Sequence, residues 1–142
     1  MNFRRGDVIL VLFPDSNLRT SKRRPALVVQ ADGLSAGLPQ TIVAMITSNM
    51  SRGGHASRVI VRLDSVEGSG LLMNSVIMTD NLATIQHSEI DRVLGAVADM
   101  GAIDAALRKC RPKTQLQQRL IPNASKARFP EFGQHALMVG SV

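Results

Sequence analysis

The sequence predicts a mainly β domain with one helix near its carboxyl end and a basic tail. Short apolar or alternating segments recur along residues 8–82 with Gly, Pro, Asp and Ser between them, which is typical of a small barrel or a curled sheet. After residue 88 the apolar residues change to a helical spacing. Residues 111–142 show no sustained period and are rich in Gln, Pro, Lys and Arg, which predicts disorder. We therefore expect one domain over residues 1–110 and a largely disordered appendage over 111–142.

The first three strands are predicted from apolar runs. Residues 8–13 are apolar without a break, which indicates a strand buried on both faces. Residues 14–24 are polar and basic and are expected to form a loop. Because Pro25 can open but not continue a central strand, the second strand is expected at 26–30. The third strand is expected at 41–47.

The later elements are less uniform. Residues 58–64 alternate between apolar and polar, which predicts a strand with one solvated face. A fifth strand is expected at 75–82. Two glycines interrupt the helical spacing after residue 88, so we expect a short strand at 92–97 and a helix from about 99 to 110.

Positive charge is concentrated at the two ends of the chain. The formal net charge is +6, but residues 1–24 carry +4, residues 25–107 carry −4 and residues 108–142 carry +6. Such a separation favours a polyanionic partner for the basic regions. The basic tail either adds nonspecific affinity for this partner or is a solvated appendage.

The composition disfavours several classes of protein. Cys110 is the single cysteine, and neither it nor the three histidines has zinc-ligand spacing. The apolar run near the amino terminus has only six residues, too few for a signal sequence or a membrane span. Four Phe and no Trp or Tyr disfavour binding dominated by base stacking. We expect a cytoplasmic protein with no metal ion, no cofactor and no membrane partner.

A basic segment before the second strand is a candidate phosphate site. Arg19, Lys22, Arg23 and Arg24 lead directly into Pro25. An arginine next to a rigid strand is held in place, and its planar guanidinium can make two hydrogen bonds to a phosphate. The alternative is a solvated loop whose charges only aid solubility.

Small polar groups and one carboxylate follow two of the apolar strands. Thr47, Ser48 and Asn49 come directly after the third strand, where they either close a turn or present a hydroxyl to a phosphate. Asp80 lies at or near the end of the fifth strand and is followed by Asn81. Asp80 is either a turn residue or a partly buried carboxylate whose pKa is raised toward that of a useful base.

Four segments occur in an order that resembles the MazF/PemK toxin family. They are Arg5–Val8, Lys22–Val29, Ala44–Ser48 and Ser75–Ile85, and they lie in register with the family over residues 4–110. The resemblance implies an SH3-like small barrel with a carboxy-terminal helix and a homodimer. It also implies cleavage of single-stranded RNA by one half of a toxin–antitoxin pair.

The resemblance further implies roles for particular residues. The family's catalytic arginine before proline falls on Arg24, and its catalytic threonine after the third strand falls on Thr47. The acid of an Arg-x-Asp pattern that some members carry falls on Asp80. Met78 stands where that pattern has arginine, and Asn81 and Ala83 stand where many members have a basic residue.

We therefore expect a cleavage in which the RNA supplies its own nucleophile. The 2′-hydroxyl attacks the adjacent phosphorus and leaves a 2′,3′-cyclic phosphate and a 5′-hydroxyl, with no metal ion required. Arg24 stabilises the developing charge, Thr47 hydrogen-bonds the same group and Asp80 is the expected base. Lys22 and Arg23 hold neighbouring phosphates. The other expected RNA contacts are Arg19, Ser48, Asn49 and Asn81.

The expected protein partner is a cognate antitoxin whose acidic, disordered segment covers the basic loop. Two other functions fit the same barrel. One is non-catalytic inhibition of a protein target, as in gyrase-poisoning relatives of this fold, and the other is a plain RNA-binding module.

Overall fold

The computed structural model describes residues 2–34, 37–64 and 67–110 as six strands and one α-helix, with two short 3-10 turns. The predicted mainly β fold with a carboxy-terminal helix is confirmed. The tail predicted to be disordered, residues 111–142, lies outside the described residues. Within the described part, no helix is long and apolar enough to cross a membrane. The elements are β1 (Asp7–Pro14), β2 (Ser21–Val28), β3 (Gln40–Thr47), η1 (Met50–Arg52), β4 (Arg58–Val61), β5 (Ser75–Gln86), η2 (His87–Glu89), β6 (Ile90–Ala96) and α1 (Gly101–Lys109).

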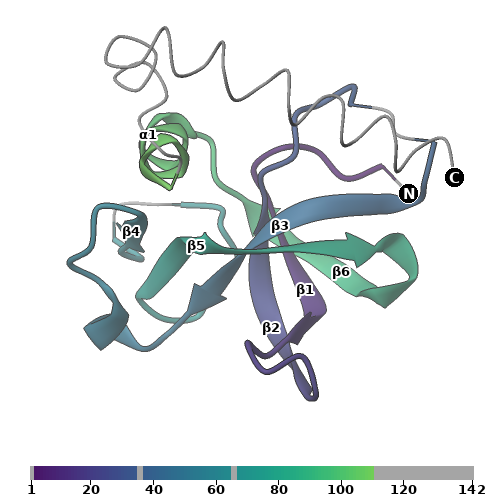
Figure 1. Ribbon diagram of the computed structural model, residues 1–142. Helices are drawn as coiled ribbons and strands as arrows, with labels where there is room; N and C mark the ends of the chain where they lie inside the picture. The colour runs from purple at the N-terminus through teal and green to yellow at the C-terminus, as the bar shows by residue number, and fades with distance from the viewer. Residues whose placement is uncertain (1, 35–36, 65–66, 111–142) are drawn as a thin grey trace, which may run out of the picture. The chain divides into compact units, whose positions relative to one another are not determined.

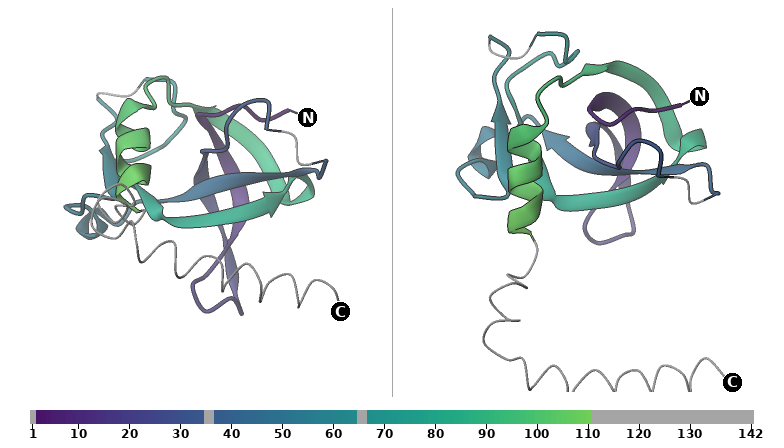
Figure 2. Two further views of the ribbon diagram at one scale, coloured as in Figure 1. Left: turned by 45° about the horizontal axis from the view of Figure 1, so that its top comes forward. Right: turned by 90° about the horizontal axis from the view of Figure 1, so that it is seen from above.

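All six strands belong to one antiparallel sheet with the order β4-β5-β3-β2-β1-β6. The sheet is strongly curled (Figure 1). Its two edges are β4 and β6, and no ladder joins them within the described residues, so the curl is not closed into a continuous barrel. Helix α1 packs against β4 and β5 (Figure 2). Arg5 ties this helix to the start of β1, because its guanidinium contacts the Asp104 carboxylate and also donates to the Val29 carbonyl.

The hydrophobic core lies on both sides of β1, as its unbroken apolar run predicts. Val8 packs in a cluster with α1, whereas Ile9 packs in a second cluster with Phe13. Successive side chains of a strand point to opposite faces, so a strand that is apolar throughout can serve both clusters. Both clusters contain side chains of β1, β2 and β3, so these three neighbouring strands are held together from both faces.

Strand β2 begins at Ser21, so the expectation of a loop up to residue 24 is wrong for its last four residues. The reason is that Ser21 to Pro25 pair with β1 alone, and β3 joins only from Ala26 onward. Pro25 therefore needs no second hydrogen-bonded neighbour, which is why proline is tolerated inside this strand. The outer part of the β1–β2 hairpin extends beyond β3, toward the bottom of Figure 1.

Strand β5 is longer than predicted and contains a bulge. It runs to Gln86, and its pairing with β3 shifts from Met45↔Met78 to Ala44↔Leu82. Residues 79–81 consequently have no partner in β3. Bulges of this kind redirect side chains, so neighbouring residues can face different surroundings.

Strand β6 confirms that the glycine-interrupted segment after residue 88 is not one helix. Gly95 lies against the loop before β5, where a Cβ atom would come within 2.1 Å of the Gly68 carbonyl oxygen. The helix begins only at Gly101.

Candidate active site

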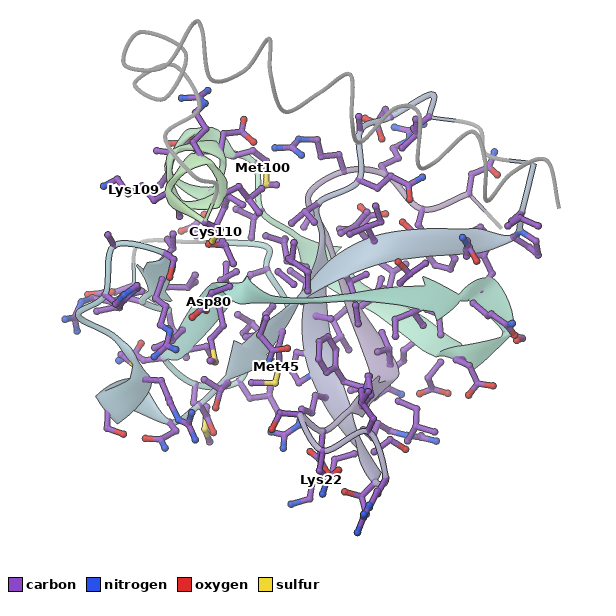
Figure 3. All side chains as sticks on the ribbon, viewed as in Figure 1. Lys22, Met45, Asp80, Met100, Lys109 and Cys110 are labelled. Atoms are coloured by element: carbon purple, nitrogen blue, oxygen red, sulfur yellow. The ribbon has the colours of Figure 1, made fainter. Side chains whose placement is uncertain are left out.

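A cavity of about 330 Å³ lies where the outer hairpin, the end of β3, turn η1 and the bulge of β5 meet. Figure 3 shows Met45, which lines this cavity, between the central strands and the hairpin that carries Lys22. We refer to this space as the hairpin cavity. Its lining consists of Pro14, Asp15, Ser16, Arg24, Met45, Thr47, Asn49, Arg52, Met78 and Asn81.

Arg24 reaches the hairpin cavity because of the alternation of side chains along β2. Its Nη2 lies 3.5 Å from Oδ1 of Asp15, and its side chain is 28% exposed. Its Nε is buried and has no hydrogen-bond partner among the described residues. A buried N–H without an acceptor is costly. The exposed part of the side chain lines the cavity, where a guanidinium can bind an anion through two N–H groups.

Asp15 is the carboxylate that faces Arg24. Its Oδ2 accepts a hydrogen bond of 2.6 Å from the Thr20 hydroxyl. That hydrogen bond lowers the pKa of Asp15, and the positive charges of Lys22 and Arg24 lower it further. Asp15 is therefore ionised at neutral pH and partly balances the charge of Arg24. The sequence alone does not mark Asp15 as a site residue, because an aspartate after proline at the end of a strand is ordinarily a turn residue.

Thr47 combines the two roles that its sequence position left open. Its Oγ1 accepts a hydrogen bond of 3.2 Å from the backbone N–H of Asn49, so it does close a turn. It also lines the hairpin cavity together with Asn49. Since a hydroxyl can donate one hydrogen bond while it accepts another, the Thr47 proton stays available for a ligand oxygen.

The expected rise in the pKa of Asp80 is wrong. The Arg58 side chain donates to both carboxylate oxygens of Asp80, at 3.3 and 3.0 Å, and these hydrogen bonds lower the pKa of that carboxyl. Arg58 lies opposite Met78 in the β4–β5 ladder, so β4 supplies a guanidinium beside Asp80. Asp80 does not line the hairpin cavity.

Asn81, the neighbour of Asp80 in the bulge, does line the hairpin cavity. Its Nδ2 lies 3.5 Å from Sδ of Met45, a weak acceptor. The hairpin cavity thus places two guanidiniums, two hydroxyls and two amides around a shared space, beside the Asp15 carboxylate. This set of donors suits a phosphate diester and leaves room for an attached base.

Comparison with known proteins identifies the family. The family model described as "PemK-like, MazF-like toxin of type II toxin-antitoxin system" matches residues 4–110. The chain belongs to this family of MazF-like toxins. It is 30% identical over 106 residues to a protein of Mycolicibacterium smegmatis named "Probable endoribonuclease MazF", a match that covers 73% of this chain and 92% of the relative.

Solved structures of MazF-like toxins share the fold. A mycobacterial endoribonuclease in complex with its cognate antitoxin superposes with a TM-score of 0.60 at 21% identity, over 77% of this chain and 94% of the other. The Mycobacterium tuberculosis toxin MazF-mt6 gives a TM-score of 0.52 at 25% identity, over 73% and 90%. MazF from Deinococcus radiodurans gives 0.57 at 17% identity, over 77% and 92%.

The remaining candidate residues of this MazF-like toxin lie outside the hairpin cavity. Arg19 and Lys22 are exposed on the outer hairpin, and Figure 3 shows Lys22 near its tip. Arg23 alternates with Arg24 and forms an ion pair of 3.6 Å with Asp91. Ser48 is exposed beside Thr47. Across residues 2–34, 37–64 and 67–110, no three His, Cys, Asp or Glu side chains are grouped as metal ligands would be.

Arg52 is a cavity residue of this MazF-like toxin that no pattern in the sequence marks. It is exposed at the end of turn η1 and lines the hairpin cavity. Its neighbours in the sequence are Ser51 and two glycines, which give no periodic pattern from which its direction could be predicted.

Proposed function

We propose that this MazF-like toxin is an endoribonuclease that cleaves single-stranded RNA in the hairpin cavity without a metal ion. The observation that carries the proposal is that Arg24 and Thr47 line one cavity, although 23 positions separate them in the sequence. The name of the Mycolicibacterium smegmatis relative supports the activity. Cleavage of cellular RNA in the cytoplasm would stop growth, as expected of the toxin of a type II system.

The proposed reaction is an internal transfer at phosphorus. The 2′-oxygen loses its proton to water and forms a bond to the adjacent phosphorus. The bond from phosphorus to the 5′-oxygen breaks, that oxygen takes up a proton from water, and the products are a 2′,3′-cyclic phosphate and a 5′-hydroxyl. Negative charge on the phosphoryl oxygens grows in the transition state. Preorganised donors contribute most at such a point, and the proposed donors are the guanidinium of Arg24 and the hydroxyl of Thr47.

Asp80 no longer fits the role of base. Both of its carboxylate oxygens accept hydrogen bonds from Arg58 and its pKa is lowered, so it is a poor proton acceptor. It also does not line the hairpin cavity. Asn49 and Asn81, which line the cavity, keep the RNA contacts expected of them. Ser48 beside it, and Arg19, Lys22 and Arg23 on the hairpin, would bind or attract the RNA backbone from outside.

The proposed assembly is a homodimer that binds a cognate antitoxin. The related mycobacterial endoribonuclease was solved with its antitoxin. The exposed Lys22 and Arg19 on the outer hairpin offer positive charge to an acidic, disordered antitoxin segment. Such a segment would occupy the surface through which RNA approaches Arg24.

The test of the activity compares single-stranded RNA with DNA of the same sequence in excess EDTA. We expect RNA to be cut and DNA to survive, because deoxyribose lacks the nucleophile. Arg24→Ala should reduce the rate roughly a hundredfold or more, and Arg24→Lys should restore little, since an ammonium lacks the planar fork. Activity that requires magnesium would refute the mechanism, and binding without cleavage would favour the RNA-binding module.

A further inference from the structure

The Arg58 guanidinium connects the bulge of β5 to turn η1. Besides its two hydrogen bonds to Asp80, its Nη1 donates to the backbone carbonyl of Arg52 at 2.9 Å. The side chains of Arg58 and Asp80 are only 21% and 34% exposed. A planar group with three directed hydrogen bonds is held in one orientation. Asp80 therefore fixes Arg58, and Arg58 fixes the end of the turn.

The segment from Thr47 to Arg52 is tied down at its start as well. Asn49 Oδ1 accepts hydrogen bonds from the backbone N–H and the hydroxyl of Ser51, at 3.2 and 2.6 Å. The Arg52 N–H donates to the Asn49 carbonyl at 3.1 Å. Among the hydrogen bonds of the described residues, the one from Arg58 reaches the turn from another strand, and it fixes the backbone at Arg52.

Arg52 brings a second positive charge to the hairpin cavity from a different chain segment than Arg24. Its side chain is exposed, and no ion pair joins it to another side chain in the described ranges. Arg24, in contrast, has Asp15 beside it. The cavity volume of about 330 Å³ reaches the range of sites for whole small molecules, which begins at about 300 Å³. A space of this volume, lined by both arginines, is large enough for a nucleotide and not only for one phosphate group.

We propose that Arg52 binds the RNA phosphate next to the scissile one, and that the Asp80–Arg58 ion pair is the positioning unit that holds it there. The inference rests on the proposed ribonuclease function, because an RNA strand would place successive phosphates along the cavity. It gives Asp80 a role through Arg58 and Arg52, and none in proton transfer. Arg52 acts on binding of the strand, and Arg24 acts on the bond that breaks.

Binding is measured with a short single-stranded RNA of mixed sequence whose riboses carry 2′-fluoro groups, which prevents cleavage by the proposed route. The dissociation constant is followed between about 50 and 200 mM salt. Arg52→Ala should weaken binding roughly tenfold and reduce the salt slope by about 0.7, the loss of one phosphate contact in a single strand. Lys109→Ala is the matched control, because it removes one exposed charge on α1, away from the hairpin cavity (Figure 3).

The positioning role is measured with a double-mutant cycle. Arg58→Gln should reproduce most of the effect of Arg52→Ala, and the double variant should bind no more weakly than Arg52→Ala alone. Asp80→Asn is the second variant, and it should shift binding in the same direction. A merely structural role would lower the thermal stability and leave the salt slope unchanged. Independent effects that multiply in the double variant would overturn the positioning role.

The two proposals fail in different assays. If the wild type binds the fluoro-substituted RNA but does not cut the matching 2′-hydroxyl RNA, the ribonuclease proposal is wrong, and the salt slope still decides the role of Arg52. If the wild type cuts RNA and Arg52→Ala behaves like Lys109→Ala in both assays, the inference about Arg52 is wrong. Because Arg52 is exposed on a turn, Arg52→Ala is expected to fold normally.

Discussion

The guanidinium of Arg24 lies 3.5 Å from the carboxylate of Asp15, at the wall of the cavity that Thr47 also lines. Arg24 and Asp15 both belong to the part of the β1–β2 hairpin that extends past β3. The arginine assigned to the transition state is thus held by a charge of opposite sign. An incoming phosphate must share this arginine with Asp15.

Asp15→Asn should therefore separate binding from catalysis. Removing the negative charge should strengthen RNA binding, because the cavity becomes more positive. The same change removes the charge that holds the Arg24 guanidinium, so kcat should fall, by roughly tenfold, while KM decreases. Steady-state cleavage at fixed ionic strength measures both. A rise in KM with unchanged kcat would contradict this account of Asp15.

Thr47→Val should lower the cleavage rate by roughly a hundredfold, because it keeps the shape of the side chain and removes the donor to the phosphoryl oxygens. Thr47→Ser is the matched control and should retain most of the activity, since it keeps the hydroxyl. The Asn49 N–H loses its acceptor in the valine variant, so thermal unfolding is measured beside the rate. Equal rates for both variants would remove the hydroxyl from the mechanism.

The ion pair of Asp80 with Arg58 should be visible in the pH dependence of stability. The pKa of Asp80 lies below its ordinary value of 3.8 in the folded protein, chiefly because of the hydrogen bonds from Arg58. The pair therefore stabilises the fold fully above about pH 3.8, and this contribution disappears as the pH falls through the lower folded pKa. Arg58→Gln should raise the pKa of Asp80 toward 3.8, as followed by carboxyl NMR.

The thermal stability of Arg58→Gln as a function of pH tests the same ion pair. The difference in Tm between the wild type and Arg58→Gln should be constant at neutral and mildly acidic pH and should shrink in strong acid. A difference that stays the same across the whole titration would show that the contact with Asp80 does not depend on its charge.

Gly95→Ala should destabilise the fold by about 3 kcal/mol, the upper end of the usual cost of overpacking. The reason is that the new methyl group would overlap the Gly68 carbonyl, 2.1 Å from the Cβ position. Gly101→Ala is the matched control. Its Cβ would meet only the Asp99 side chain, at 3.1 Å, and it sits in a helix, where alanine is favoured. Denaturant unfolding measures both, and equal stabilities would contradict the close approach of β6 to the loop.

Most strands could be predicted from the sequence, but the solvated start of β2 could not. β1 and β3 are apolar over most of their length because they cross the core. Residues 21–24 of β2 are polar or charged, and the first three are exposed, so their composition is that of a loop although they pair with β1. Hydrophobic periodicity reports burial, and a projecting hairpin has little of it.

In the candidate site, too, some residues could be identified from the sequence and others could not. Arg24 and Thr47 could be identified because each lies next to an apolar strand segment that fixes its position. Arg52 lies in a short turn without a repeating pattern, and its place depends on Arg58. The pKa of Asp80 also depends on Arg58, which is 22 positions away in the sequence. Contacts between residues so far apart become visible only once the strand pairing is known.

Thr79, Asp80 and Asn81 lie in the stretch of β5 that β3 leaves unpaired, while regular ladders continue on either side of it. Of these three residues Asn81 lines the hairpin cavity, so a substitution of Asn81 alters the cavity wall without shifting the alignment of the two strands. Altered RNA preferences can therefore be sought at Asn81 without redesigning the sheet.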